Sequence, residues 1–279
     1  MKKKKTGDRI TLIIGTLLAI LALLPLIWAF SASFQTNQDI FANLAPFSIH
    51  TFIPEHFTLQ SYINIFTKYN FFTAVLNTLI IALITIVFGV LISSMAAFAL
   101  TKMRFKGRSF VSMIVLFAIM VPFEAIAIPL YSLVDSMHMV DTMSALVLPA
   151  LANGMAIFLF QQFFRDIPDS LIEAASLDGA GPWRIFFTIV TPISKPTIIS
   201  ASLIFFMSQW DAFLWPVLVA KAPQLRMVQV ALTDFKMEHG TMWSEMFAAS
   251  IIAALVPCLI LLPLQKYYVR GITSSGIKE

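Results

Sequence analysis

Two carboxylates lie inside stretches of the chain that are otherwise apolar. They are Glu124 and, in the string Trp210-Asp211-Ala212-Phe213-Leu214-Trp215-Pro216, Asp211. A charge within an apolar segment is costly and is usually paired or functional. With Trp210 and Trp215 close by, carboxylates and aromatic faces could hold a sugar through hydroxyl hydrogen bonds and ring stacking. The alternatives are a hydrogen bond that packs two helices, or a carboxylate that faces a water-filled vestibule without contacting a ligand.

The same carboxylates allow two other kinds of chemistry. Glu124 and Asp211 could be the acid and base of a membrane-embedded enzyme, or the proton relay of a proton-coupled secondary transporter. Against an enzyme, no nucleophile–base string, metal-ligand cluster or G-x-S-x-G motif accompanies them. The single cysteine, Cys258, lies in an apolar run, so a Cys-based metal site is excluded. The sequence therefore predicts neither catalytic residues nor a metal site.

The composition is that of a chain built for a lipid bilayer. Hydrophobic residues make up 58% and charged residues 12% of the chain, and the mean hydropathy is +0.84. Soluble domains have roughly 45–50% apolar residues and about 25% charged residues. A helix that crosses a bilayer needs about 20 apolar residues. Apolar runs of that order lie at about 10–33, 74–100, 110–134, 143–164, 197–220 and 246–264. They predict an all-α membrane protein with six transmembrane helices and a single domain, 1–279.

The placement of Lys and Arg predicts the orientation of these spans. If the N-terminus is cytoplasmic, fifteen of the nineteen Lys and Arg residues lie on the cytoplasmic side. Positive residues beside a span resist translocation, so we predict that both termini are cytoplasmic. The net charge of +4 is then a topological signal and not the footprint of a nucleic-acid partner. Glu124 and Asp211 would each lie about fourteen residues, or roughly 21 Å, from the cytoplasmic end of their spans.

The cytoplasmic segment 165–196 carries clear signals for the start of a helix. Ser170 and Glu173 have the S-x-x-E spacing of a capping box, in which each side chain satisfies a free backbone N–H. Pro168 discourages an earlier start. A short helix should therefore begin near Ser170.

The same segment carries signals for the end of that helix. Gly179 and Gly181 should stop it in a left-handed conformation, and Pro182 suits the first turn of a following helix. Small residues in its middle would let another surface approach closely: Ala174, Ala175 and Ala180. The pattern predicts a pair of short helices that fits a groove of another protein; the alternative is a helix hairpin at the membrane interface.

The string Glu173-Ala174-Ala175, then Asp178-Gly179-Ala180, then Ile189, Pro192 and Pro196, resembles the EAA loop of permease subunits in binding-protein-dependent ABC importers. In that family the loop is a coupling helix seated in a cleft of the cytoplasmic ATPase subunit. The position of this string, just before the penultimate predicted span, also agrees with the position of the loop in that family. The resemblance implies contact with an ATPase for Glu173, Ala174, Ala175, Asp178, Gly179, Ala180 and Pro192. Changing Glu173 to Lys or Gly179 to Asp is then expected to abolish transport while leaving membrane insertion intact.

The resemblance covers most of the chain and is to the carbohydrate branch with maltose-type permeases. It is carried by Asn77-Thr78, Val121-Pro122, Ile128-Pro129, the Trp210–Pro216 motif and the tail 265–279. The family usually has Asn where this chain has Asp211. In maltose-type relatives the tail reaches between the ATPase chains, which implies such a contact for Gly271, Thr273 and Gly276. The alternative for the tail is a frayed end without a partner.

No G-x-x-x-x-G-K-[ST] phosphate loop occurs in the chain, so we expect it to bind neither ATP nor another cofactor. The resemblance implies that ATP and Mg²⁺ bind to a separate ATPase. The partners that it implies are a second permease in a heterodimer, two ATPase subunits and an extracytoplasmic solute-binding protein that delivers a carbohydrate. The implied location is a bacterial-type inner or plasma membrane.

Overall fold

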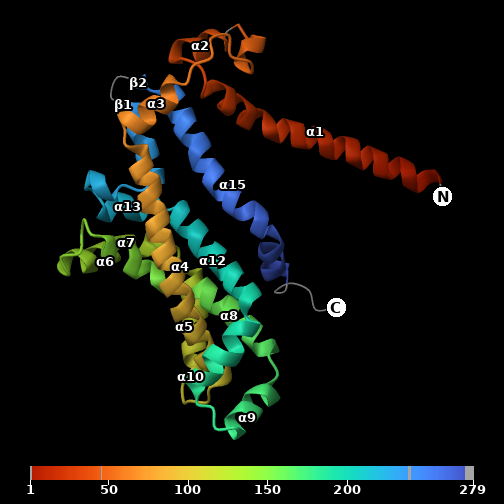
Figure 1. Cartoon of the computed structure of the whole chain (residues 1–279), viewed down its shortest axis with the longest axis vertical. Helices are drawn as coiled ribbons and strands as arrows, with labels where there is room; N and C mark the ends of the chain where they lie inside the picture. The colour runs from red at the N-terminus through yellow and green to blue at the C-terminus, as the bar shows by residue number, and fades with distance from the viewer. Residues whose placement is uncertain (1, 45, 238–239, 274–279) are drawn as a thin grey trace. The chain divides into compact units, whose positions relative to one another are not determined.

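The computed structural model describes residues 2–44, 46–237 and 240–273. These residues form mainly α-helices, with short 3-10 helices and one antiparallel pair of two-residue strands (Figure 1). The chain divides into two compact units, Met1–Phe72 with Ala231–Leu255, and Thr73–Val230 with Val256–Glu279. Each unit is described by itself.

The first unit holds the N-terminal elements and those that lead into the last helix. They are α1 (Lys2–Ala32), α2 (Asn37–Ala42), η1 (Ile49–Thr51), α3 (Gln60–Thr67), η4 (Leu232–Phe235), β1 (Lys236–Met237), β2 (Gly240–Thr241) and the first part of α15 (Trp243–Thr273). The second unit holds nearly all of α4 (Phe71–Lys102) and the elements that follow it. They are α5 (Arg108–Met120), α6 (Phe123–Ser136), α7 (Met143–Leu151), α8 (Gly154–Asp166), α9 (Asp169–Leu177), α10 (Pro182–Ile185), the π-helical turn η2 (Phe186–Val190), α11 (Thr191–Ile193), α12 (Lys195–Trp210), α13 (Leu214–Val219), η3 (Pro223–Leu225) and α14 (Val228–Ala231).

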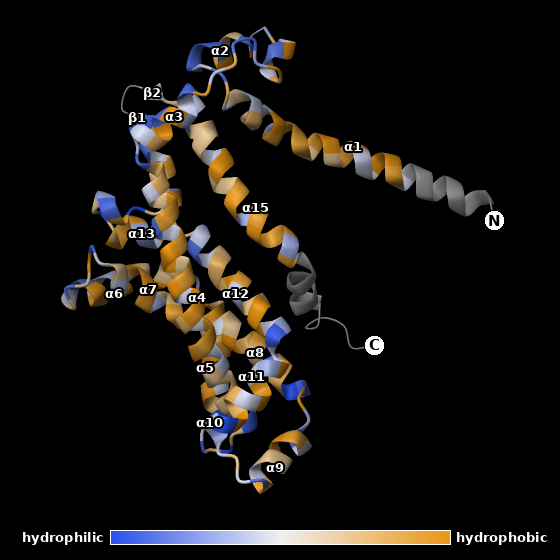
Figure 2. Cartoon of the chain, viewed as in Figure 1, coloured by the Kyte–Doolittle hydropathy of each residue, from blue (hydrophilic) through white to orange (hydrophobic). Residues whose placement is uncertain are grey.

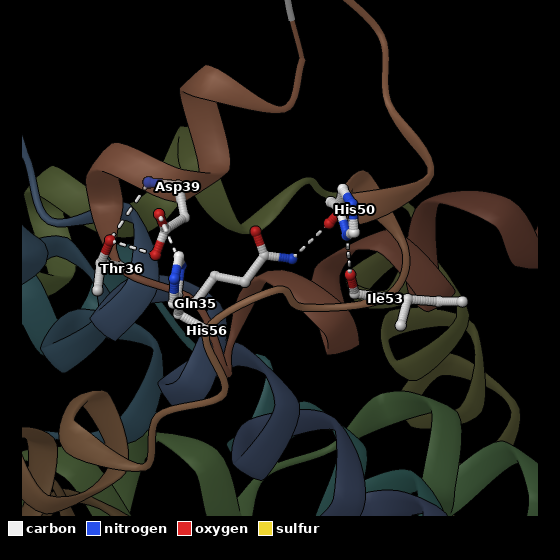
Figure 3. Close-up of polar contacts among 6 residues, drawn as sticks. All are labelled: Gln35, Thr36, Asp39, His50, Ile53 and His56. Carbon is white, nitrogen blue, oxygen red and sulfur yellow. Dashed lines mark hydrogen bonds and ion pairs between the residues drawn. The ribbon is translucent and has the colours of Figure 1, made fainter.

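Polar contacts close the segment that follows α1. Asp39 N donates to Thr36 Oγ1 at 3.2 Å, which caps α2, and Gln35 Nε2 donates to the backbone oxygen of His50 at 3.1 Å (Figure 3). His56 Nδ1 lies 3.7 Å from Asp39 Oδ1 (Figure 3). The chain thus folds back on itself directly after its first helix.

Two further hydrogen bonds join this segment to the start of α15 within the first unit. Ser244 N donates to Asn37 Oδ1 at 2.9 Å, and Asn64 Nδ2 donates to Glu245 Oε1 at 2.9 Å. Glu245 is 9% exposed, and its carboxylate in the first turn of α15 is favourable to the positive end of the helix dipole. Residues distant in the sequence therefore form one polar cluster.

Length and composition identify the helices that can cross a membrane. In the described part of the chain, Thr11–Ala32, Phe71–Lys102, Met143–Asp166 and Trp243–Leu264 each qualify, and Figure 2 shows α1, α4 and α15 as mainly hydrophobic. Two bent pairs qualify if each counts as one span: Arg108–Met120 with Phe123–Ser136, bent by 105°, and Pro182–Ile193 with Lys195–Trp210, bent by 84°. The described residues thus hold between four and six spans. The predicted spans 110–134, 143–164 and 197–220 are not continuous helices, because they are interrupted after Met120, Leu151 and Trp210.

The second unit has two apolar cores. One is formed by buried residues of α4, α6, α7 and α13 and of the segment after α13, including Ile81, Leu146 and Trp215. The other is rich in phenylalanine and includes Phe98 of α4, Phe164 of α8 and Phe186 of η2. The rings of Phe98 and Phe186 lie 5.4 Å apart. The first core borders the cavity described below through Leu146 and Trp215.

Gly89 allows α4 and α12 to approach closely. A Cβ atom at Gly89 would lie 2.6 Å from the ring of Phe205, which is 1% exposed. No other residue would fit without moving that ring. The contact fixes the two helices against each other.

Asn77 and Thr78 hold the segment before α14 against α4. Asn77 Nδ2 donates to the backbone oxygens of Gln224 and Arg226, at 2.8 and 3.0 Å, and Val228 N donates to Thr78 Oγ1 at 2.9 Å. The pair that contributed to the family resemblance therefore has a structural task in this chain.

Candidate functional site

Three helix interruptions meet in the second unit. The first separates α5 from α6 at Val121 and Pro122, which are both extended; a residue before proline is disfavoured in helical conformation. The second separates α7 from α8 at Ala152 and Asn153. The third separates α12 from α13 at residues 211–213. Pro216 accounts for the third, because its ring would clash with the carbonyl four residues earlier in a continuous helix.

A cavity of about 550 Å³ lies where these interruptions meet. That volume is within the range of about 300–1,000 Å³ that is usual for small-molecule sites. It is lined by residues that follow the first break, residues that precede and form the second, and residues on both sides of the third: Phe123, Glu124, Leu146, Pro149, Ala150, Ala152, Asn153, Ser208, Gln209, Asp211, Ala212, Phe213, Leu214, Trp215 and Pro216. We refer to it below as the cavity.

The cavity brings together three of the four residues predicted for a ligand path. Glu124, in the first turn of α6, and Asp211, directly after α12, are both exposed to it, and Trp215 of α13 forms part of its wall. Within the described residues, neither carboxylate has a hydrogen-bond or ion-pair partner. Trp210 does not line the cavity, because it is 1% exposed and stacks on Phe206 with the ring centroids 5.6 Å apart.

The ring of Trp215 is held in one orientation. Its Nε1 donates to the backbone oxygen of Ala145 at 2.9 Å, and its edge meets the ring of Phe123 at 5.9 Å and 88°. It is 8% exposed. The two aromatic rings therefore form a fixed apolar wall beside the carboxylates.

Three polar residues of the cavity were not predicted from the sequence: Asn153, Ser208 and Gln209. Asn153 Oδ1 accepts from Ala156 N at 3.0 Å and caps α8. Gln209 lines the cavity, is 6% exposed, and its side chain has no hydrogen bond within the described part of the chain. The signals that could have found them are an Asn-Gly pair inside an apolar run and polar residues next to Trp210-Asp211.

The second candidate site is α9, the predicted coupling helix. It begins at Asp169, with Pro168 in extended conformation as its N-cap and no capping hydrogen bond from a side chain. The predicted capping box of Ser170 and Glu173 is therefore wrong. The helix starts one residue earlier, so Ser170 lies inside its first turn and cannot act as the cap.

The end of α9 follows the prediction at Gly179 but not at Gly181. Gly179 has a φ of +78°, and its N–H donates to the oxygen of Ser176 at 3.1 Å, while Ala180 N donates to the oxygen of Ala175 at 2.9 Å. These are the two hydrogen bonds of a Schellman motif. Gly181 has a φ of −70° and is not a left-handed stop, and Pro182 opens α10 as expected.

α9 has an inner and an outer face. Ile172, Ala175 and Ala180 pack against the phenylalanine-rich core and are half-buried. Glu173, Ala174 and Asp178 are exposed, and Leu177 is 90% exposed. Of the two adjacent alanines predicted to meet a partner, only Ala174 faces outward. Pro192 is exposed in α11.

A lysine at the end of α4 holds the start of α9. Lys102 Nζ donates to the backbone oxygen of Ile167 and to Asp169 Oδ1, each at 2.6 Å, and its side chain is 5% exposed. The hydrogen bond from Lys102, followed by its positive charge, lowers the pKa of Asp169 from its usual value. Lys102 is a positioning residue that the sequence presented only as one of several cytoplasmic cations.

The remaining predicted site residues lie in the tail. Gly271 and Thr273 belong to α15, and Gly276 lies outside the described residues. Across the described ranges, no group of three or more His, Cys, Asp and Glu residues is placed to hold a metal ion.

In the comparison with known proteins, one family model covers both candidate sites, the cavity and α9. Residues 89–274 match the model of the family described as binding-protein-dependent transport system inner membrane component. This range includes the cavity and α9. The crystal structure of a bacterial ABC transporter involved in the import of the acidic polysaccharide alginate contains a chain that matches with a TM-score of 0.80 at 23% identity, over 94% of this chain and 97% of that one.

Curated relatives match over almost the whole length. The arabinooligosaccharides transport system permease protein AraQ of Halalkalibacterium halodurans is 30% identical over 99% of both chains. The sn-glycerol-3-phosphate transport system permease protein UgpE of Yersinia pestis bv. Antiqua is 31% identical over 95% of both. Nothing among these relatives supports a proton-coupled secondary transporter or an enzyme. The chain belongs to the family of inner membrane components of binding-protein-dependent transport systems, as a multi-pass permease subunit of the ABC importer type.

Proposed function

We propose that this chain is one of two permease subunits of an ATP-driven importer that moves a carbohydrate across a bacterial inner membrane. The observation that carries the proposal is the build of α9. A short helix is anchored on one face by the phenylalanine-rich core and by Lys102, while its other face, with Leu177 90% exposed, is open for a partner. Such a helix can transmit a force between two proteins without being part of either core.

In this proposal the single permease domain 1–279 has six spans, with each bent helix pair counted as one. The excess of Lys and Arg in the segments that include 101–108 and 165–196 supports cytoplasmic termini and a cytoplasmic α9. The cavity then lies in the membrane part of the chain. The interrupted helices around it are an arrangement known from transporter sites.

The proposed partners follow from the exposed face of α9 and from a sequence that has no phosphate-binding loop for ATP. A second permease completes the path, and two ATPase subunits with ATP and Mg²⁺ hold α9 through Glu173, Ala174, Asp178 and Gly179. An extracytoplasmic binding protein delivers the solute. The names of the relatives, which transport arabinooligosaccharides or sn-glycerol 3-phosphate, favour a polyhydroxylated substrate. Contact of Gly271, Thr273 and Gly276 with the ATPase is part of the same proposal.

The test is purification of the tagged chain by gentle extraction from its native membrane, with the co-purified chains identified by mass spectrometry. We expect an ATPase and a second permease, with ATP hydrolysis that increases when a sugar-loaded binding protein is added. Recovery of this chain alone would overturn the proposal. Labelling of Leu177→Cys by a membrane-impermeant reagent in sealed right-side-out vesicles, with Cys258 replaced by Ala, tests the orientation. Labelling from the outside would contradict a cytoplasmic α9.

A further inference from the structure

The cavity is lined by a largely buried glutamine whose amide has no partner among the described residues. Gln209 is 6% exposed, and its amide makes no hydrogen bond to any residue of the described ranges. Because Gln209 lines the cavity, its amide can find a partner there in water or in a ligand, as most polar groups of largely buried residues do. A primary amide both donates and accepts, which matches a hydroxyl group of a ligand.

The charged residues that line the cavity are all acidic. Glu124 and Asp211 face it, and none of the described residues that line it is Lys, Arg or His. Carboxylates accept hydrogen bonds from hydroxyl groups but repel an anion, and this repulsion grows where water is scarce. A phosphate or uronate in the cavity would meet two like charges with no compensating cation.

The helix ends at the cavity do not reverse this preference. Two helices of more than eight residues begin there, α6 and α8, and a helix N-terminus attracts anions. Glu124 already occupies the first turn of α6, and Asn153 Oδ1 already accepts the free N–H of Ala156 in α8. Asn153 therefore caps the end of α8, whereas the end of α6 has no capping hydrogen bond from a side chain and carries the negative charge of Glu124 in its first turn.

We infer that the cavity is a subsite for an uncharged saccharide ring, in which Gln209, Asp211 and Glu124 bind hydroxyl groups and the fixed rings of Trp215 and Phe123 contact the apolar face of the sugar. The subsite discriminates against phosphorylated and acidic sugars. Gln209 determines specificity in it. This inference rests on the proposed function and narrows its substrate to a neutral carbohydrate.

The test uses the assembled complex in lipid nanodiscs without the binding protein, so that selection by the cavity is measured alone. Saturation-transfer NMR compares arabinotriose and maltotriose with two anionic probes, sn-glycerol 3-phosphate and digalacturonate. We expect the neutral probes to bind and the anionic probes not to bind. Gln209→Leu should weaken binding of the neutral probes by about tenfold, as expected for the loss of one hydrogen bond to a ligand.

A second variant tests whether the cavity selects ligands by charge. Glu124→Gln with Asp211→Asn keeps the shape of the cavity and removes both charges, and should admit the anionic probes. Asp135→Asn is the matched control, because Asp135 is an exposed carboxylate of α6 that does not line the cavity. Equal binding of neutral and anionic probes by the unmodified complex, binding of neither neutral probe, or retained binding in Gln209→Leu would each overturn the inference.

These outcomes are separate from those that test the proposed function. A chain that assembles with an ATPase, and whose ATP hydrolysis responds to the binding protein, supports the importer whatever the cavity binds. Failure of assembly overturns the importer itself.

Discussion

The cavity and α9 belong to the same unit but are built in opposite ways. The walls of the cavity come from three interrupted helix pairs, and their side chains hold each other, as Trp215 does through Ala145 and Phe123. α9 is an uninterrupted helix of which the chain covers only one face. The walls of the cavity are thus held by contacts within this chain, whereas the outer face of α9 has none. Substitutions at the two places should therefore change different measurable quantities.

The largest effect is expected at the outer face of α9. Leu177→Asp should reduce transport at least about 100-fold, because burial of an unpaired charge at an interface costs several kcal/mol. The measurements are uptake by proteoliposomes and recovery of the ATPase with the tagged chain. Ser170→Asp, in the first turn of the same helix, is the control and should have little effect. Normal uptake by Leu177→Asp would show that this face meets no partner.

The next effect is expected at the end of α9. Gly179 has a φ of +78°, and a left-handed conformation costs a residue with a side chain roughly 1–2 kcal/mol. Gly179→Val should therefore lower uptake by about tenfold, through loss of the turn that orients the helix. Gly179→Asn, a residue that tolerates this conformation, should retain most activity. Equal losses in both variants would contradict the conformational explanation.

A smaller effect is expected at the joint between α4 and α9. Lys102→Met removes both hydrogen bonds of Nζ and should lower the ratio of solute transported to ATP hydrolysed by about fivefold, since Asp169 is exposed and the ion pair is screened. Lys102→Arg should restore much of this ratio. A merely structural role would instead reduce transport and hydrolysis in parallel.

At the cavity, a change in the wall should affect stability and not assembly with the ATPase. Trp215→Phe keeps the aromatic ring but leaves the oxygen of Ala145 without its donor, at a cost of about 1 kcal/mol. Thermal unfolding of the complex should occur at lower temperature. Recovery of the ATPase with the tagged chain should stay unchanged, and a loss of that recovery would mean that the cavity and α9 are not separable as described.

The smallest effect is expected from pH. The pKa of Asp169 is lowered in the folded chain. Its contribution to stability is therefore present above the pKa of the unfolded chain, and it is lost as the pH falls through the lower pKa of the folded chain. Between about pH 5 and 8 the carboxylate stays ionised, so the ratio of transport to ATP hydrolysis should not change through this contact. A pH-dependent difference between Asp169→Asn and the unmodified chain in that range would contradict the assignment.

The sequence predicted α9 better than it predicted the cavity. Gly179 and Pro182 are local signals, and their conformations depend on few other residues. The capping box failed because Pro168 and the contact of Asp169 with Lys102, 67 residues earlier, set the start of the helix. Glu124, Asp211 and Trp215 were identified by their types alone. Gln209 and Asn153 were missed, because their role depends on three breaks that meet only in the folded chain.

The prolines of Val121-Pro122 and Pro216 indicated two of the interruptions in the sequence. The hydropathy pattern nevertheless predicted one continuous span across each of them. Apolarity is averaged over a long window, whereas a helix ends at single residues. The inward position of Ala175 could not be predicted either, since the core that covers it contains residues from α4 to α12.

The contact of Gly89 with Phe205 bears on how this chain can change shape. With the ring 2.6 Å from any added Cβ atom, α4 and α12 cannot rotate past each other without withdrawing a fully buried phenylalanine. We therefore expect α4 and α12 to stay together at this point between the conformational states of transport. We expect the angular change that opens and closes a path to fall on the non-helical residues 121–122, 152–153 and 211–213, of which 152–153 and 211–213 also line the cavity.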